Sequence, residues 1–259
     1  MFAEERHGAI AELLTAQGRV SVTDLAQRFA ITPETVRRDL ALLEELGELR
    51  RVHGGAVSAD RGSTAETSVP ERLATHSGEK HRIATAALAL LPRREASIIL
   101  DAGTTTEVLA GLIAHRGADA PELLVLTNSI PIATALSSAP RVTLHFLGGR
   151  VRGVTQAAVG AGTVAALRSF RPDIAFLGTN GIHEDFGLST PDPEEAAVKE
   201  AFVQSARRTV VLADASKLGA ETLVRFAGLE EVDTLVTDGE PSPALAEALT
   251  AAEAEVVRA

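Results

Sequence analysis

The sequence predicts a chain of two parts, a small helical unit that ends in a hairpin and a larger unit of layered α/β type. Residues 21–57 contain two capped helical segments, paired arginines and a Gly-Gly turn, whereas residues 71–259 alternate apolar strand-like runs with helix-like segments. Such alternation is typical of a sheet between layers of helices. We expect domains at residues 1–57 and 71–259, joined by a linker at 58–70 that is rich in Ser, Thr, Ala and Gly.

Two helix starts are visible in the small unit. The hydroxyl of Ser21 can accept a hydrogen bond from the free amides of a first turn, and an aspartate follows three residues on. Thr32 precedes Pro33, and proline suits the first position of a helix because its missing N–H has no partner to lose there. Gly47 is expected to end this helix in the left-handed conformation. The second helix is therefore predicted over residues 33–46.

This second helix has a predicted buried face and a predicted free face. Apolar side chains recur at helical spacing and predict one buried stripe, formed by Val36, Leu40, Leu43 and Leu46. At about 100° per residue, Arg38 lies opposite that stripe, with Thr35 on one flank and Arg37 on the other. We expect Thr35 and Arg38 to contact base edges in a major groove, because a guanidinium fits the paired acceptors of guanine, and Arg37 to contact a phosphate.

A short cationic hairpin follows the helix. Leu49 and Val52 are expected to pack inward before a Gly-Gly turn. The side chains expected to point outward are those of Arg50, Arg51 and His53. A hairpin of this kind beside a recognition helix suits contacts to phosphates, so the small unit is predicted to be a winged helix-turn-helix domain. The alternative is an ordinary helical subdomain whose arginines are merely solvated.

Charge and composition limit the possible functions. The chain carries a net charge of −10, and residues 1–57 hold seven Arg against nine Asp or Glu, a net of −2. A diffuse basic footprint is thus missing, so DNA affinity is expected to depend on a few placed contacts, which disfavours a nucleoid protein. Cysteine is absent and the seven histidines are scattered without ligand spacing, so we expect no metal site and no cofactor. No apolar run approaches the ~20 residues that span a bilayer, and no signal peptide is recognisable, so we expect a cytoplasmic protein without a membrane partner.

The larger unit contains seven candidate strands. They lie at residues 97–100, 123–126, 142–147, 174–177, 209–212, 234–236 and 255–257. Most are continuous apolar runs, as expected for strands that helices cover on both faces. One long helix is predicted over residues 71–91 before the first strand.

Glycines and polar side chains follow five of these strands, at the carboxyl ends where open α/β sheets bind ligands. The segment at residues 101–106 opens a helix, and its amides, hydroxyls and helix dipole suit a phosphate or carboxylate. Arg150, Lys199 and Lys217 can add positive charge. Groups that can bind sugar hydroxyls are Asp101, Asn128, Asn180, Glu195 and Asp214. Simpler alternatives are plain turns at the glycines and an ordinary surface pair of Glu195 with Lys199.

These motifs carry a family resemblance. TPETVRRDLALLEELGELRRVHGGAV resembles the DNA-binding domain of the DeoR family of bacterial sugar-metabolism repressors, and LDAGTTT, LTNS, LGGRVR, FLGTNGI, GLST, EEAAVK and LADASKLG resemble its sensor domain. The resemblance implies an isomerase/deaminase-like layered sheet, the fold of ribose-5-phosphate isomerase and glucosamine-6-phosphate deaminase. It also implies effector contacts from Asp101, Gly103, Thr104, Thr105, Thr106, Asn128, Gly148, Gly149, Arg150, Gly178, Thr179, Asn180, Gly181, Glu195, Lys199 and Lys217.

The function that follows is a repressor of sugar-catabolism genes that binds double-stranded operator DNA and is released by a phosphorylated sugar. Parts of the sequence further resemble repressors of fructose and phosphotransferase-system genes. A homo-oligomer, dimer or tetramer, is expected to place paired winged helices on two half-sites. The alternative is a sugar-phosphate isomerase or deaminase with Asp101, Asp214 or Glu195 as acid or base; it is disfavoured because the strand-end loops hold no histidine, and no catalytic residue is assigned.

Overall fold

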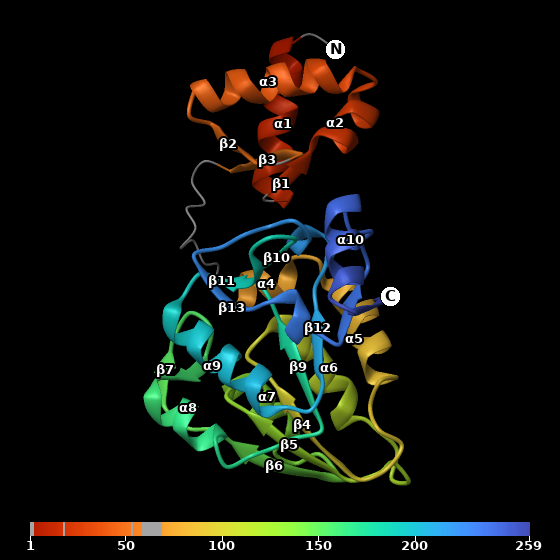
Figure 1. Ribbon diagram of the computed structural model, residues 1–259, viewed down its shortest axis with the longest axis vertical. Coiled ribbons are helices and arrows are strands. Elements are labelled where there is room, and N and C mark those ends of the chain that lie inside the picture. The colour runs from red at the N-terminus through yellow and green to blue at the C-terminus, as the bar shows by residue number, and fades with distance from the viewer. Residues whose placement is uncertain (1–2, 18, 53, 59–68) are drawn as a thin grey trace. The chain divides into compact units, whose positions relative to one another are not determined.

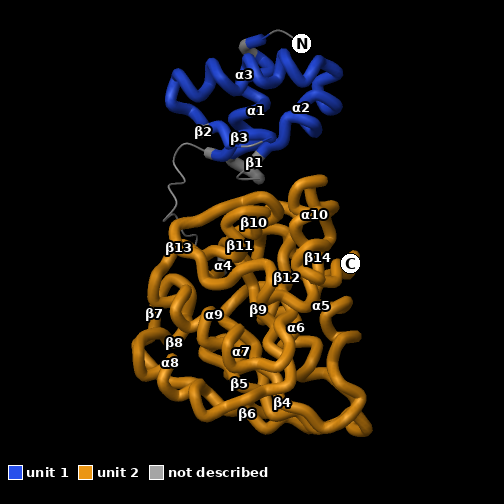
Figure 2. The backbone as a smooth tube through the Cα atoms, in the orientation of Figure 1, with its two compact units in different colours: residues 1–65 blue, residues 66–259 orange. Residues whose placement is uncertain are grey.

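The computed structural model is drawn in Figure 1, and it describes residues 3–17, 19–52, 54–58 and 69–259. The chain divides into two compact units, Met1–Ala65 and Glu66–Ala259 (Figure 2). The predicted linker at 58–70 falls mainly on residues 59–68, which lie outside the described residues.

The first unit packs three helices against a three-stranded antiparallel sheet. The helices are α1 (Ala3–Gln17), α2 (Val22–Phe29) and α3 (Pro33–Glu45), and the strands are β1 (Arg19–Ser21), β2 (Leu49–Val52) and β3 (Gly55–Ser58). The sheet has the order β1-β3-β2, so the predicted hairpin β2–β3 gains a third strand that the sequence did not reveal. Apolar side chains from all three helices and from the sheet form one core. The predicted winged helix-turn-helix is confirmed.

The predicted helix ends are present in the structure. Ser21 Oγ accepts a hydrogen bond at 3.0 Å from the amide three residues on, and Thr32 Oγ1 accepts one at 3.2 Å from the amide of Thr35. Pro33 opens α3, as expected. After the helix, Gly47 has a φ of 74° and its amide donates to the carbonyl of Glu44 at 3.0 Å. Local sequence therefore sets where α2 begins and where α3 begins and ends.

The predicted buried stripe on α3 is wrong at one residue. Val36, Leu40 and Leu43 are buried in the core, but the side chain of Leu46 is 63% exposed. The helix ends at Glu45, so Leu46 is the capping residue from which the chain turns away. Helical periodicity does not apply beyond the last turn.

The second unit is built on a seven-stranded parallel sheet with the order β15-β14-β12-β9-β4-β5-β6. Its strands are β4 (Ala96–Leu100), β5 (Leu123–Thr127), β6 (Val142–Phe146), β9 (Ile174–Gly178), β12 (Thr209–Leu212), β14 (Thr234–Thr237) and β15 (Glu255–Arg258). All seven predicted strands are therefore confirmed, and together they form one sheet.

Helices cover both faces of this sheet. One face packs against α5 (Ser77–Leu88), α6 (Thr104–Ala114) and α7 (Ile130–Leu136). The other packs against α8 (Ala161–Leu167), α9 (Pro193–Ser205) and α10 (Pro243–Ala251). Within β4, Ile98 and Leu100 belong to the first core and Ile99 to the second, so strand alternation divides the apolar residues between two layers. Figure 1 shows this three-layer arrangement.

Short strands add two smaller sheets that were not predicted. The hairpin β7 (Arg150–Arg152) and β8 (Ala157–Val159) follows β6, and an antiparallel sheet combines β10 (Gly181–His183), β11 (Gly187–Thr190) and β13 (Val224–Ala227). Strands of three or four residues that carry Gly, Arg or Ser give too little apolar pattern to be recognised. Two short 3-10 helices, η1 (Ala215–Lys217) and η2 (Leu229–Glu231), complete the unit.

The helix predicted over residues 71–91 is wrong as one piece. It consists of α4 (Val69–Ala74) and α5, separated at His76, whose φ is 55°. The buried ammonium of Lys80 donates to the carbonyls of Arg72 and Thr75, the latter at 2.6 Å. A lysine on the second helix thus satisfies one carbonyl of the first helix and one of the turn that follows it, which stabilises the break.

Candidate functional site

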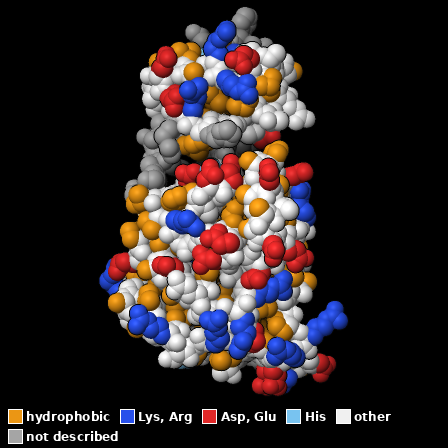
Figure 3. Space-filling view, viewed as in Figure 1, with side chains coloured by type: hydrophobic (Ala, Val, Ile, Leu, Met, Phe, Trp, Pro, Cys, Tyr) orange, Lys and Arg blue, Asp and Glu red, His pale blue; other side chains and the backbone are white. Residues whose placement is uncertain are grey.

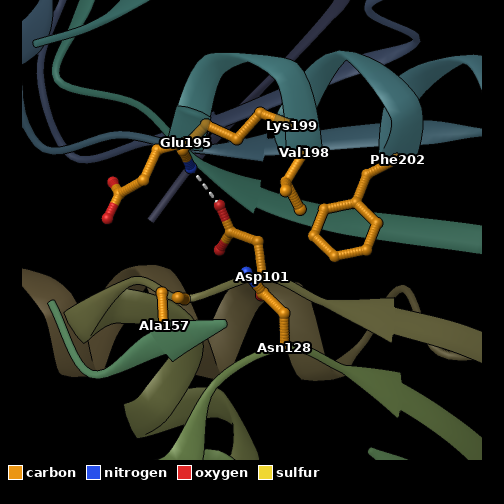
Figure 4. Close-up of a pocket in the computed structure, with 8 residues that line it drawn as sticks. Asp101, Asn128, Ala157, Glu195, Val198, Lys199 and Phe202 are labelled. Atoms are coloured by element: carbon orange, nitrogen blue, oxygen red, sulfur yellow. Dashed lines mark hydrogen bonds and ion pairs between the residues drawn. The ribbon is translucent and has the colours of Figure 1, made fainter. Parts of the chain in front are cut away.

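The topology of the large sheet points to one place for a ligand. The chain enters at β4 in the middle of the sheet, adds β5 and β6 on one side, and then returns to the other side of β4 with β9. Open α/β sheets bind ligands at the carboxyl ends of the strands where the order reverses in this way. A small pocket, with about 10 Å³ of free space, lies at this position. Figure 4 shows its lining residues, Asp101, Ala102, Asn128, Ala157, Glu195, Val198, Lys199 and Phe202.

A buried ion pair crosses the pocket. The ammonium of Lys199, on α9, donates to the carboxylate of Asp101, which directly follows β4 (Figure 4). Asp101 also accepts a hydrogen bond from the amide of Gly178 at 3.0 Å and from the hydroxyl of Thr106 at 3.1 Å. Lys199 donates in addition to the carbonyl of Gly178 at 2.8 Å. Both charges are thus neutralised and hydrogen-bonded, as buried charges require.

Glu195 does not form the surface pair with Lys199 that helical spacing allows. Both side chains are buried, with 6% and 7% of their surface exposed, and they bind different partners. Glu195 accepts from Arg152 Nη1 at 2.6 Å and from the hydroxyl of Thr155. Arg152 also lies 3.3 Å from Asp192. The alternative of an ordinary surface pair is therefore wrong, and Glu195 belongs to a second charged group at the rim of the pocket.

Four residues of this second group, Arg152, Thr155, Asp192 and Glu194, were not singled out from the sequence. Arg150 and Arg152 occupy alternate positions of β7, and they pair with the consecutive acids Glu194 and Glu195 of α9. Alternating arginines on a strand and neighbouring glutamates at a helix start are complementary patterns, but nothing in either indicates that they meet. Asp192 was recognisable as a helix cap, because it precedes Pro193 and accepts from the amides of the first turn. The remaining missed residue is Thr155.

Asn128 supplies an acceptor without a donor. Its amide nitrogen donates to the carbonyl of Ala158 at 2.9 Å, which fixes the orientation of the side chain. Asn128 Oδ1 is buried and has no hydrogen-bond partner among the described residues. Because Asn128 is 3% exposed and lines the pocket, a hydroxyl or amine in the pocket would satisfy this oxygen. An unsatisfied buried acceptor costs about 1–3 kcal/mol, so it favours a ligand that donates there.

The segment predicted to bind an anion lies at the start of α6. Gly103 is the residue before the helix and has no side chain to cap the first amides. The hydroxyl of Thr106 turns inward, to the carbonyls of Asp101 at 2.9 Å and Gly103 at 2.7 Å. The helix amides at Thr104 and Thr105 therefore keep the donor capacity that suits an anion.

The other residues predicted to contact an effector do not line the pocket. Thr179 donates to the carbonyl of Gly181 at 2.6 Å, Asn180 accepts from Thr190 at 3.1 Å, and Arg150 pairs with an acid of α9. The carbonyl of Gly148 accepts from Thr163 at 2.9 Å. They lie around the carboxyl ends of β6 and β9, and their bonds are made within the chain.

Lys217 belongs to a separate charged group at the end of β12. Burial raises the pKa of Asp214, but Lys217, the bonds from Ser216 and the charge of His76 outweigh it, so the pKa lies below its ordinary value. Burial lowers the pKa of Lys80, against the opposing charge of Asp214. This group links η1 to α5 electrostatically.

The residues predicted to bind DNA differ in how they are held. Thr35 lies at the start of α3, where its hydroxyl is 2.9 Å from that of Thr32. Arg37 and Arg38 are exposed; the first pairs with Glu34 at 3.1 Å, and the second forms no ion pair with another described residue. Figure 3 shows basic and acidic side chains interspersed on the visible surface of the first unit.

The hairpin β2–β3, which we call the wing, is described only in part. Arg51 is exposed but bound to Glu44 of α3, with 2.8 Å between its Nε and the carboxylate. Its backbone amide donates to the same carboxylate at 2.8 Å. The side chain of Arg50 and the whole of His53 lie outside the described residues. Leu49 is buried as predicted, and Val52 is half-buried.

A buried network that the sequence did not reveal orients α3. Asp39 accepts two hydrogen bonds from Arg6 of α1, at 2.7 and 2.9 Å, and lies 2.9 Å from His7 Nε2. Burial raises the pKa of Asp39, but the bonds from Arg6 and His7 outweigh it, and the pKa lies below its ordinary value. The network ties the middle of α3 to α1.

Two further classes of site were sought in the described residues. In these ranges no three His, Asp or Glu side chains gather in a way that could hold a metal ion. Their helices also include none with the length and hydropathy needed to cross a membrane.

Comparison with known proteins identifies both units. Residues 6–62 match the DeoR-like helix-turn-helix domain, and residues 75–239 match the DeoR C terminal sensor domain. The second match alone covers more than half of the chain.

Curated relatives align over almost the full length. The HTH-type transcriptional regulator FruR of Bacillus subtilis, itself described as uncharacterized, is 35% identical over 240 residues, 93% of each chain. The glycerol-3-phosphate regulon repressor of Escherichia coli is 32% identical over 95% of each chain. The lactose phosphotransferase system repressor of Streptococcus mutans is 34% identical over 92% of this chain and 93% of its own.

Among solved structures, a ribose 5-phosphate isomerase A from Methanocaldococcus jannaschii matches 55% of each chain with a TM-score of 0.42 and 18% identity. A likeness at that level supports no argument about this chain. The family matches and the curated relatives do support a conclusion about this chain. They place a helix-turn-helix domain before a sensor domain, in a family of regulators rather than of enzymes. The chain belongs to the DeoR family of transcriptional regulators.

Proposed function

We propose that the protein represses sugar-catabolism genes by binding operator DNA, and that a phosphorylated sugar in the sensor domain releases it. The observation that carries the proposal is the pocket at the switch point, which combines a buried cation, Lys199, with the unsatisfied acceptor Asn128 Oδ1. The free amides at the start of α6 lie directly after Asp101 in the chain. Two relatives, named as repressors of a glycerol-3-phosphate regulon and a phosphotransferase system, support the class of effector.

The pocket residues suit distinct parts of such a ligand. The amides of Thr104 and Thr105 suit the phosphate, whereas Asn128 and Glu195 suit sugar hydroxyls. Lys199 becomes available to an anionic group if that group replaces Asp101 as its partner. The pocket has about 10 Å³ of free space, room for about one water molecule, so a sugar phosphate can enter only if side chains move. The remaining predicted contacts, Gly148, Gly149, Arg150, Gly178, Thr179, Asn180, Gly181 and Lys217, would then act at the rim.

The DNA-binding half of the proposal uses α3 as the recognition helix. Thr35 and Arg38, on its exposed face, are assigned to base edges. Phosphate contacts are assigned to Arg37, Arg50, Arg51 and His53. We further propose that the protein acts in the cytoplasm as a dimer or tetramer, because paired half-sites require paired winged helices.

The experiment combines DNA release with ligand binding. Labelled duplexes from the protein's own promoter region are titrated by fluorescence anisotropy, with and without fructose 1-phosphate, fructose 6-phosphate, glycerol 3-phosphate and ribose 5-phosphate. One of these is expected to lower DNA affinity and to raise the thermal unfolding midpoint, since a ligand of the native state alone stabilises it. The unphosphorylated sugars serve as controls. Indifference to every such duplex, or turnover of a sugar phosphate, would contradict the proposal.

A pair of variants tests the site itself. Asn128→Leu removes the pocket acceptor at similar volume and is expected to weaken ligand binding at least tenfold. Gln204→Leu, an exposed change at the far end of α9, is the control and should leave the ligand response unchanged. Equal responses in both variants would place the ligand elsewhere.

A further inference from the structure

Lys80, near the start of α5, is a buried charge to which the proposed function gives no part. Only 6% of its surface is exposed, and its ammonium donates to the carbonyls of Arg72 and Thr75. Within the part of the chain that the structure describes, no acid forms an ion pair with it. An ammonium has three N–H donors, and a buried charge without an opposite charge is costly. The position therefore favours a further acceptor that carries negative charge.

The chain uses lysine at very few positions. It contains 22 arginines but only three lysines, Lys80, Lys199 and Lys217. Lys199 lines the pocket, and Lys217 lies in η1, which follows β12. A lysine ammonium is a compact charge whose donors rotate, whereas the guanidinium of arginine is a rigid fork. In a chain that otherwise relies on arginine, the third lysine suits a cation that exchanges one partner for another.

Hydrogen bonds place η1 beside α5. Asp238, which follows β14, accepts from Arg82 of α5 at 3.0 Å. Its other carboxylate oxygen accepts from the amide of Ala215, the first residue of η1, at 2.9 Å. The 3-10 helix that carries Lys217 therefore begins against the helix that carries Lys80.

Lys80 also belongs to a charged group that reaches the start of α6. Burial lowers its pKa, and the charged side chains that act on it are Asp214, Lys217, Arg72 and Glu79. Arg72 lies on α4, which packs against α6, and its charge opposes the rise that burial causes in the pKa of Glu107, in the first turn of α6. Arg72 Nε is buried and has no hydrogen-bond partner among the described residues. An anion at the first amides of α6 would thus lie beside the cations of this group.

The helix α4 depends on tertiary contacts for its stability. It has six residues, Val69–Ala74, and a helix of this length is not stable alone. Val69 is buried, α4 packs against α6, and Lys80 binds one of its carbonyls and one of the turn after it. In Figure 1, α4 is the first helix after the linker. Loss of the bonds from Lys80 would therefore loosen the junction between the linker and the sensor unit.

We propose that Lys80 transmits ligand binding to the linker, because an anionic group bound at the start of α6 binds the ammonium in place of the carbonyls of Arg72 and Thr75 and so releases α4. The exchange is favourable because a phosphate is a stronger acceptor than a neutral carbonyl. This inference rests on the proposed function, which supplies the anion.

Release of α4 explains how a ligand lowers DNA affinity. The released helix adds its six residues to the linker. A longer linker lowers the effective concentration of the second winged helix at its half-site, once the first is bound. The ligand then weakens the binding to paired half-sites without contacting the DNA-binding unit.

Hydrogen exchange in the full-length wild type tests this change of partners. The amide of Thr75 donates to the carbonyl of Glu71 at 3.1 Å and reports on the end of α4. Exchange is measured with and without fructose 1-phosphate, fructose 6-phosphate, glycerol 3-phosphate and ribose 5-phosphate. A phosphate that lowers DNA affinity is expected to speed exchange at Thr75 at least tenfold. Release of DNA with unchanged exchange overturns this inference alone, whereas no release by any of the four overturns the proposed function with it.

A pair of variants tests the part of Lys80 itself. Lys80→Met removes the ammonium and keeps an apolar side chain of similar length. Without ligand it is expected to speed exchange at Thr75 at least tenfold and to lower DNA affinity to that of the ligand-bound wild type, and the phosphate should then have no further effect. Arg93→Met, which removes an exposed positive charge beyond the other end of α5, is the control and should behave as the wild type.

A purely structural lysine predicts a different result. Lys80→Met would then speed exchange at Thr75 but leave the release of DNA by the phosphate unchanged, and this outcome overturns the proposal. Should the variant not fold, the measurement on the wild type decides alone.

Discussion

Lys199 on α9 and Asp101 at the end of β4 form a buried ion pair although 98 residues separate them in the sequence. The pair joins a helix on one face of the sheet to the strand at which the chain order reverses. Both side chains line the pocket, where each neutralises the charge of the other. Ligand binding, in the proposed function, therefore competes with a bond that stabilises the fold.

The first prediction concerns this pair. Lys199→Met should destabilise the sensor unit by about 3–5 kcal/mol, because it leaves the carboxylate of Asp101 buried without its cation. The double variant Asp101→Asn with Lys199→Met should recover most of that loss, yet should not regain a response to sugar phosphates. Urea unfolding measures the first effect, and ligand titration the second. A cost below about 1 kcal/mol for the single change would show that the pair is not neutralising a buried charge.

The second prediction compares neighbouring glycines. A Cβ at Gly149 would lie 2.1 Å from Thr163 Oγ1 and 2.7 Å from the carbonyl of Val159, whereas a Cβ at Gly148 meets nothing within 4 Å. Gly149→Ala should therefore cost about 1–3 kcal/mol through overpacking, and Gly148→Ala should be close to neutral. Unfolding midpoints of the two variants decide the matter. Equal costs would mean that the glycines serve backbone freedom instead of this close approach.

The third prediction separates the roles of two adjacent arginines. Arg38→Ala should reduce the discrimination between the operator and a single-base variant by about 1–3 kcal/mol, since it removes the proposed base contact. Arg37→Ala should weaken binding to all duplexes alike and lower the slope of log K against log salt by about one unit. Anisotropy titrations at several salt concentrations give both quantities. Uniform weakening by Arg38→Ala would remove it from base recognition.

The fourth prediction concerns the wing. Because Glu44 holds both the guanidinium and the amide of Arg51, a phosphate must compete with it for this side chain. Glu44→Gln should therefore strengthen DNA binding and steepen its salt dependence, whereas Arg51→Ala should weaken binding and flatten it. Weaker binding by Glu44→Gln would indicate that the pair positions the wing for DNA.

The fifth prediction is a pH dependence. Because the bonds from Arg6 and His7 hold the pKa of Asp39 below its ordinary value, the stability that they contribute is complete above about pH 4. It should be lost as the pH falls through the lowered pKa. Hydrogen exchange of the α3 amides, compared between wild type and Asp39→Asn, should show a difference at pH 7 that shrinks below pH 4. Asp24→Asn, an exposed change on α2, is the control. A difference that stays constant with pH would contradict the assignment.

The elements that the sequence predicted share a local cause. The caps at Ser21 and Thr32 depend on neighbouring residues, and the seven strands are runs of apolar residues long enough to be recognised. Which strand lies at an edge was not predictable: β6 carries apolar residues at alternate positions, yet it is partly exposed, and no strand in the described part of the chain pairs with its outer side. The break near His76 was missed because its cause is a lysine four residues on, which bonds back to the preceding helix.

The candidate site was predictable to a similar degree. Asp101, Asn128, Glu195 and Lys199 were expected from strand ends and from the family resemblance, and the structure brings these four together. Their pairing was not predictable. Glu195 is the nearer acid in the sequence, but the tertiary structure places Lys199 against Asp101. Arg152 and Asp39 were missed for the same reason: each is defined by a partner that lies far away in the sequence.

The peptide groups of Gly178 bind both members of the central pair, since its amide donates to Asp101 and its carbonyl accepts from Lys199. A molecule that separates the two charges must therefore disturb the backbone of β9 as well. The exchange rate of this one amide with deuterated solvent would then follow occupancy directly. This measurement would allow candidate metabolites to be ranked by their binding to the isolated protein, without knowledge of the operator sequence.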